Sequence, residues 1–362
     1  MKTTNAFLFV AVLFIAGSIS AYAGGTIEKI ADTVNAVNET VQGVNDILRD
    51  QLPAPSGGGP AAWTRVSPNP FGDYIIEGIA FGMNADGNNR WVAGSRGGRL
   101  AYSADGRSWT AVANSPFGET VNAVAFGGGR WVAVGRGEIA YSANGQTWTA
   151  VSDTTFGAYD YINGIAYGGG RWVAVGDEGR MAYSSDGTRW TTVANSRFGS
   201  SYISGIAWGG GRFVAVGDDG KMAYSSDGVS WTAVANSTFS DIINGVAYGN
   251  NRFVAVGYDG KMAYSADGAT WTAVADSAFD GDTINAITYG MNADGSGRFV
   301  AVGYGKMAYS SPTVVGDDGV SWTAIANSPF NDEVLAVAFG MNAAGGGRFV
   351  AVGWEGMAYA DW

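Results

Sequence analysis

Residues 203–234 read ISGIAWGGGRFVAVGDDGKMAYSSDGVSWTAV, and this stretch decides the fold class. Apolar and small residues alternate in steps of two, as in β-strands with one face in a core. Turns rich in glycine separate four short runs, at 203–208, 212–216, 221–225 and 231–234. The stretch therefore predicts four antiparallel strands joined by tight turns.

The same unit recurs along the chain. Trp-Thr pairs lie 39 to 51 residues apart, beginning at Trp63, Trp109, Trp148, Trp190, Trp231, Trp271 and Trp322. A period of about 40 residues is typical of a propeller blade. The final unit stops at Trp362 before its outer strand, whereas residues 62–66 supply a surplus one. We therefore predict an all-β, seven-bladed β-propeller over residues 62–362, with four-stranded antiparallel blades and an N-terminal strand that closes the last blade.

The composition excludes several kinds of chemistry. Among 362 residues there are 57 glycines, but no cysteine and no histidine. Disulfides, thiol nucleophiles, histidine general bases and the commonest zinc sites are therefore absent. The formal net charge of −11 argues against nucleic acid and anionic membrane surfaces as partners.

Residues 1–23 have the pattern of a secretory signal. Lys2 gives a basic start, residues 6–17 are an apolar run, and Ala21-Tyr22-Ala23 fits a cleavage site. The apolar run is short for a membrane span, which takes about 20 residues. We expect secretion after cleavage near Ala23 and no integral membrane span in the mature protein; the alternative is an uncleaved anchor.

Residues 24–52 predict an amphipathic or coiled-coil helix. Its apolar seam repeats at alternating spacings of three and four: Ile27, Ile30, Val34, Val37, Val41, Val44 and Leu48. β-Branched seam residues favour trimers or tetramers, so a homo-oligomer through residues 26–52 is one hypothesis. The alternative is a single helix lying against the C-terminal domain. Residues 53–61 predict a linker rich in proline and glycine.

The turn before each Trp-Thr pair carries a further motif. One copy reads Ser103-Ala104-Asp105-Gly106-Arg107-Ser108-Trp109. It resembles the Asp-box, or BNR repeat, of seven-bladed propellers of the secreted bacterial type. The resemblance implies that the box is a structural turn, in which the aspartate bonds backbone amides. The box positions are Asp105, Asn144, Asp186, Asp227, Asp267 and Asp318. The usual box has one more residue between Asp and Trp, and residues 312–316 interrupt the sixth copy.

Comparison of the copies shows where a site could lie. Variation gathers in the loop after the second strand and in the loop between blades, which emerge on the same face in propeller topology. The candidate ligand-binding residues are Tyr74, Arg96, Arg136, Tyr159, Tyr161, Asp177, Tyr202, Asp218, Tyr258, Tyr304 and Trp354. Aromatic rings stack on sugars, while carboxylates and guanidinium groups bond hydroxyls. The alternative is that these loops are polar and variable without a role.

Three functions fit these observations. The first is a secreted or cell-surface binding protein, lectin-like, that holds a glycan or a surface protein or peptide. The second is a structural or assembly component of an envelope or matrix. The third, a sialidase-like glycoside hydrolase, would need an asymmetric catalytic set that these near-uniform repeats do not supply. We expect no enzyme, no cofactor and no metal site.

Overall fold

A computed structural model describes residues 62–84, 87–292, 295–311, 321–342 and 346–362. The described ranges all belong to one compact unit of the chain. The predicted signal, helix and linker, and the sixth box with Asp318, lie outside the described residues and stay predictions. Within the described ranges, no helix has the length and apolar character needed to span a bilayer.

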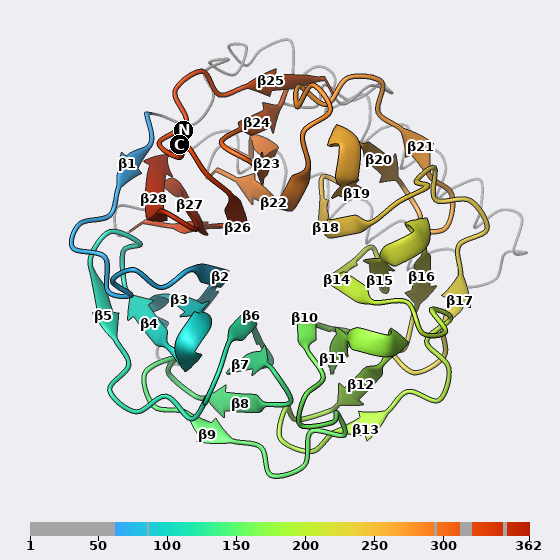
Figure 1. Cartoon of the computed structure of the whole chain (residues 1–362), viewed down its shortest axis with the longest axis horizontal. Coiled ribbons are helices and arrows are strands. Elements are labelled where there is room, and N and C mark those ends of the chain that lie inside the picture. The colour runs from blue at the N-terminus through green and yellow to red at the C-terminus, as the bar shows by residue number, and fades with distance from the viewer. Residues whose placement is uncertain (1–61, 85–86, 293–294, 312–320, 343–345) are drawn as a thin grey trace, which may run out of the picture. The chain divides into compact units, whose positions relative to one another are not determined.

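The described unit is a ring of seven four-stranded antiparallel sheets around a central channel (Figure 1), which confirms the predicted all-β propeller. The first three blades are formed by β2 (Ile76–Met83), β3 (Asn89–Ser95), β4 (Leu100–Ser103) and β5 (Trp109–Ala111); β6 (Val121–Gly127), β7 (Arg130–Gly135), β8 (Ile139–Ser142) and β9 (Thr149–Ala150); and β10 (Ile162–Gly168), β11 (Arg171–Gly176), β12 (Met181–Ser184) and β13 (Thr191–Thr192).

The next three blades follow the same order. They contain β14 (Ile203–Gly209), β15 (Arg212–Gly217), β16 (Met222–Ser225) and β17 (Thr232–Ala233); β18 (Ile243–Gly249), β19 (Arg252–Gly257), β20 (Met262–Ser265) and β21 (Thr272–Ala273); and β22 (Ile284–Met291), β23 (Gly297–Gly303), β24 (Met307–Ser310) and β25 (Trp322–Ala324). In four blades a short 3-10 turn follows the second strand: η1 (Arg96–Gly98), η2 (Asp177–Gly179), η3 (Asp218–Gly220) and η4 (Tyr258–Gly260).

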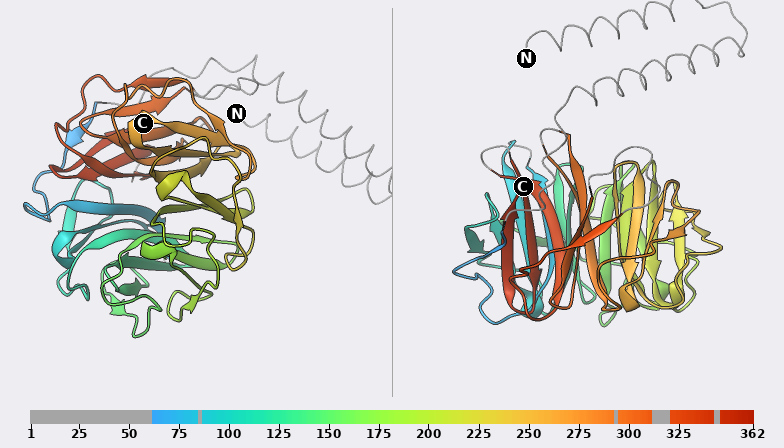
Figure 2. Two further views of the ribbon diagram at one scale, coloured as in Figure 1. Left: turned by 45° about the vertical axis from the view of Figure 1, so that its right-hand side comes forward. Right: turned by 90° about the horizontal axis from the view of Figure 1, so that it is seen from above.

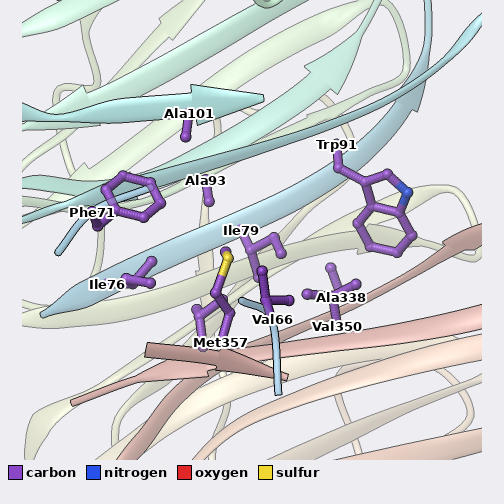
Figure 3. Packing of buried hydrophobic residues seen from close by; sticks show 11 residues of the cluster. Val66, Phe71, Ile76, Ile79, Trp91, Ala93, Ala101, Ala338, Val350 and Met357 are labelled. Carbon is purple, nitrogen blue, oxygen red and sulfur yellow. The ribbon is translucent and has the colours of Figure 1, made fainter. Parts of the chain in front are cut away.

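The seventh blade joins the two ends of the propeller. It contains β26 (Val334–Met341), β27 (Gly347–Gly353), β28 (Gly356–Asp361) and the N-terminal β1 (Thr64–Arg65). Thr64 pairs with Tyr359 and Arg65 with Ala358, as the surplus outer strand predicted. Val66, which follows β1, is buried among Phe71 and Met357 (Figure 3). Main-chain pairing of β1 with β28 and the burial of Val66 therefore close the ring.

The outer strands are shorter than predicted. We expected strands over residues 62–66 and 231–234, whereas the strands span Thr64–Arg65 and Thr232–Ala233. One further main-chain hydrogen bond follows each strand, from the amides of Val66 and Val234 to the carbonyls of Met357 and Met222, both at 2.9 Å. Trp231 lies next to the paired segment, is 3% exposed and donates its indole N–H to the carbonyl oxygen of Gly228 at 3.3 Å. The tryptophan thus packs into the core, and this ends the ladder early.

Adjacent blades lock together through an aromatic residue against a glycine. The ring of Trp208 on β14 covers Gly168 at the end of β10, where an added Cβ would lie 1.9 Å from Trp208 Cγ. The corresponding glycine of the seventh blade, Gly340, meets Phe81 of the first. Each inner strand can therefore approach its neighbour only because glycine stands at this position.

The repeated arginine of the second strand belongs to the scaffold. Each guanidinium lies over a tyrosine ring of the third strand, at 4.8 to 5.7 Å from the ring centroid. The pairs are Arg90 with Tyr102, Arg130 with Tyr141, Arg171 with Tyr183, Arg212 with Tyr224, Arg252 with Tyr264, Arg298 with Tyr309 and Arg348 with Tyr359. Cation–π contacts of this kind stabilise the sheet and remove seven arginines from the candidate site.

The Asp-box turns are held by side chain to backbone hydrogen bonds. Asp267 Oδ1 accepts from the amides of Ala269 and Thr270, both at 2.8 Å, and from the Ser265 hydroxyl at 3.0 Å. Asn144 makes the same contacts through Oδ1 in the second blade. Hydrogen bonds, foremost from the Thr270 amide, hold the pKa of Asp267 below its ordinary value. The box is therefore a structural turn, and the uncharged amide oxygen of Asn144 accepts the same hydrogen bonds as the carboxylate of Asp267.

We predict that Asp267→Ala lowers the free energy of unfolding by about 1 to 2 kcal/mol, since it removes a turn cap, whereas Asp267→Asn costs less. The folded pKa is depressed, so the wild-type carboxylate stabilises the protein above about pH 4 and loses this effect as pH falls through the folded pKa. The difference in the free energy of unfolding between the wild type and Asp267→Asn should therefore become smaller in acid. Denaturant unfolding at about pH 5 and about pH 2.5 measures it. Equal losses for both variants would contradict the assignment.

Candidate ligand-binding face

Two kinds of loop meet on one face of the ring, which we call the upper face. Its loops are the turns after the second strand of each blade and the connections between blades. The amide of Asp218 donates to the Tyr202 carbonyl, and that of Trp354 to the Glu333 carbonyl, each at 3.0 Å. Arg136 likewise forms a bridge with Tyr161. The structure thus brings both sets of variable residues together, as expected.

Exposed aromatic side chains gather on this face. Of nine large apolar or aromatic side chains exposed in the described part of the chain, seven belong to it: Tyr74, Tyr159, Tyr161, Tyr202, Tyr258, Tyr304 and Trp354, with exposed fractions of 40 to 78%. The other two, Met83 and Met291, lie at the ends of β2 and β22, next to the hairpins of the opposite face. The side view in Figure 2 separates the two faces of the ring. Concentration on one face is typical of an interaction surface.

Arg96 and Arg136, the two candidate arginines outside the repeated strand position, already have carboxylate and aromatic partners. Arg96 Nε pairs with Glu77 Oε1 at 2.5 Å and lies 5.6 Å from the Trp354 ring. Arg136 pairs with Glu119 at 2.6 Å and lies over the rings of Tyr159 and Tyr161 at 5.3 and 5.4 Å. The hydrogen bond that Arg136 donates to Glu119 raises the pKa of Arg136 above its ordinary value. Each arginine is therefore held by a carboxylate and an aromatic ring on the same face.

A ring of bulged residues surrounds the channel mouth, although the alternating pattern of the strands did not indicate it. In every blade the register of the inner strand shifts after its first residue, so that the second residue is unpaired. These residues are Glu77, Asn122, Asn163, Ser204, Asn244, Asn285 and Leu335. All seven line a channel cavity of about 240 Å³. A β-bulge redirects a side chain, and here it directs seven toward one opening.

Four asparagines of this ring connect neighbouring blades. Their amide nitrogens donate to the first carbonyl of the next inner strand, at 2.9 to 3.1 Å. The pairs are Asn122 with Ile162, Asn163 with Ile203, Asn244 with Ile284 and Asn285 with Val334. Glu77, Ser204 and Leu335 break this pattern. The mouth is thus asymmetric in charge and size, although the scaffold repeats.

Two aspartates occupy one position in neighbouring blades but differ in their contacts. Asp177 accepts from Asn163 Nδ2 and from the Tyr161 amide, both at 3.1 Å. In the next blade Ser204 stands in place of the asparagine, and among the described residues none donates a hydrogen bond to the Asp218 carboxylate. Partial burial, and then the charges of nearby acidic residues, raise the pKa of Asp218. Asp218 is therefore a half-buried carboxylate with spare bonding capacity.

The face suits binding of polar groups. Rings offer stacking surface, and Asp218 offers an acceptor in the same blade as Ser204, which lines the cavity. Within the described ranges, no three acidic side chains lie close enough together to hold a metal ion. The roles of the eleven candidate residues in binding stay predictions, although all of them lie in the loops of one face.

Comparison with protein families matches residues 158–360 to the DUF6242 beta-propeller domain. The chain belongs to the DUF6242 beta-propeller family. The Asp-box kinship remains a resemblance. No curated protein shows a significant match to this DUF6242 propeller.

Solved structures are similar to the DUF6242 propeller in fold. YCF48 bound to D1 peptide has a TM-score of 0.61 at 15% identity, covering 86% of this chain and 97% of that chain. YCF48 from Cyanidioschyzon merolae has a TM-score of 0.59 at 18% identity, with 83% and 98% covered. Virginiamycin B lyase from Staphylococcus aureus has a TM-score of 0.65 at 12% identity, with 83% and 97% covered. At these identities the likeness shows the fold alone.

Proposed function

We propose that this DUF6242 propeller is an exported binding protein whose upper face holds a glycan or a peptide across the channel mouth. One observation carries the proposal: seven of the nine exposed large apolar or aromatic side chains in the described ranges lie on this face. A solved propeller of the same fold, YCF48, was determined with a peptide bound. That structure supports a peptide as one of the two ligand classes.

The proposal includes no catalysis. A sialidase-like site would need free arginines, whereas Arg96 and Arg136 are each occupied by a carboxylate and an aromatic ring. A histidine-to-alanine variant of the virginiamycin B lyase is described as catalytically inactive, and this chain contains no histidine. Both observations favour binding over either kind of bond cleavage.

Residues 26–52 are proposed to oligomerise the chain through their apolar seam. Several copies of one face held together would convert weak contacts into avidity. The helix would then serve the same function as the ring, because a binding face with modest single-site affinity gains most from multivalency.

We predict that combined Tyr258→Ala, Tyr304→Ala and Trp354→Ala weakens ligand binding by roughly 100-fold, because aromatic hot spots each contribute about 1 kcal/mol or more. Residues 24–362 are tested on a glycan array, with and without Ca²⁺, and against a displayed library of random dodecapeptides. The matched control is Met83→Ala with Met291→Ala, which removes equally exposed side chains away from the upper face. Absence of binding in both screens, or an equal loss of affinity in the aromatic variant and in the methionine control, would reject the proposal in favour of a structural role.

A further inference from the structure

The upper face repeats one arrangement, in which a guanidinium is held by a carboxylate and an aromatic ring. The first example joins Arg96 and Glu77 of the first blade to Trp354 of the seventh. In the second blade Arg136 is held by Glu119 and by tyrosine rings. Arginine suits this arrangement because its planar fork pairs with carboxylates and stacks on rings. The face therefore shows which cation its own chemistry accommodates.

In the fourth blade the carboxylate and the rings are present but no guanidinium is, and the charge of Lys221 acts on Asp218 without a hydrogen bond or ion pair between them. Asp218 follows β15, and its amide bonds the carbonyl of Tyr202, whose ring is 51% exposed. Tyr258 takes the position of Asp218 in the next blade and is 41% exposed. Lys221, the nearest lysine along the chain, is engaged by Ser201 at 2.6 Å and by Asp219 at 3.2 Å. No described side chain thus supplies a hydrogen bond or ion pair to Asp218.

The channel mouth leaves room beside this carboxylate. Ser204 stands where the third blade has Asn163, so the amide that anchors Asp177 has no counterpart at Asp218. Ser204 also lines the cavity of about 240 Å³, far larger than the roughly 30 Å³ that one water occupies. Because Ile203 pairs with Gly217, Asp218 lies at the end of the strand beside Ser204, just outside the residues that line the cavity.

We infer that the ligand is a peptide and that it places an arginine or lysine side chain at Asp218, flanked by Tyr202 and Tyr258, with the neighbouring peptide crossing the channel mouth. The inference rests on the proposed function and names the ligand class within it. Charge complementarity selects this occupant, because a neutral glycan carries no cation to pair with a half-buried carboxylate. A long flexible stem lets the charged group reach Asp218 while the backbone stays above the rings.

The test uses the chain from residue 24 and a displayed library of random dodecapeptides. We expect the selected peptides to be enriched in arginine or lysine at one position. Asp218→Asn should weaken their binding at least ten-fold, as should replacement of the basic residue by norleucine, since each change removes a charged hydrogen bond. Ser204→Asn copies the third blade, offers Asp218 an internal amide, and should also weaken binding. Fluorescence anisotropy measures all affinities.

The matched control is Asp219→Asn, which removes an equal charge one residue away, where Ser201 and Lys221 already engage the carboxylate. It should change affinity less than two-fold. Thermal unfolding checks that every variant is folded. Selected peptides without basic residues, or equal effects of the two aspartate variants, would overturn the inference while leaving the binding face intact. Enrichment of no peptide would overturn it too, and the glycan array then decides the proposed function separately.

Discussion

Gly168→Ala is expected to lower the free energy of unfolding by about 3 kcal/mol, because a single methyl group has no space between the third and fourth blades. The added Cβ would lie 1.9 Å from Cγ and 2.1 Å from Cδ2 of Trp208. Trp208 is itself held against Phe213, with ring centroids 4.5 Å apart, so it cannot turn away freely. Urea unfolding of the variant and wild type measures the loss.

A control and a double mutant identify the cause. At Gly118 an added Cβ meets only a carboxylate oxygen of Glu138 at 3.7 Å, so Gly118→Ala should change stability by less than about 0.5 kcal/mol. In a Trp208→Ala background, Gly168→Ala should cost below about 1 kcal/mol, because the clashing ring is gone. An undiminished cost in that background would place the strain elsewhere than at the contact between blades.

Val66→Asp is the second change with a large expected effect, a loss of about 4 kcal/mol. Val66 is 7% exposed and packs with Phe71 and Met357 where β1 closes the last blade (Figure 3). A carboxylate there would be buried without a partner, so we expect the strand to leave its place. Thermal unfolding and amide exchange at β28 report the opening.

The matched control for this closure is Thr64→Asp, two residues earlier on the same strand. Thr64 is exposed and pairs with Tyr359 through its backbone alone. The same carboxylate should therefore cost less than about 1 kcal/mol at that position. If both substitutions destabilised the ring equally, the cause would be a negative charge on this segment rather than the loss of the buried Val66 side chain.

The number of blades and the closure could be predicted because each strand recurs in a repeat whose copies can be counted. The short length of the outer strands could not be predicted, since the sequence around Trp231 is compatible both with a longer strand and with a tryptophan that packs into the core. The upper face was predictable as a set of variable loops. Which of its charged side chains lack a partner could not be predicted, because the pairing of Arg96 with Glu77 depends on a contact between neighbouring strands.

The bulged ring left a signal that alternation alone overlooks. In Ile162-Asn163-Gly164-Ile165 two core residues lie three apart, which breaks the strand period of two. The shift of register between Ile162 and Gly164 is the structural counterpart of that break. Asn163 recurs in other blades and so resembled scaffold, although its side chain reaches the channel mouth. A residue can thus be repeated and still border a site.

The contact between Arg65 and Glu355 joins residues 290 positions apart. During translation the strand with Arg65 leaves the ribosome long before its partner strand is made. Loop closure over such a length is entropically costly, and contacts of high sequence separation form slowly. The nascent chain must therefore keep β1 and the adjoining Val66 unpaired until β28 has been made. A chain lost to early termination would carry that strand, with no partner for it, into any later encounter with other chains.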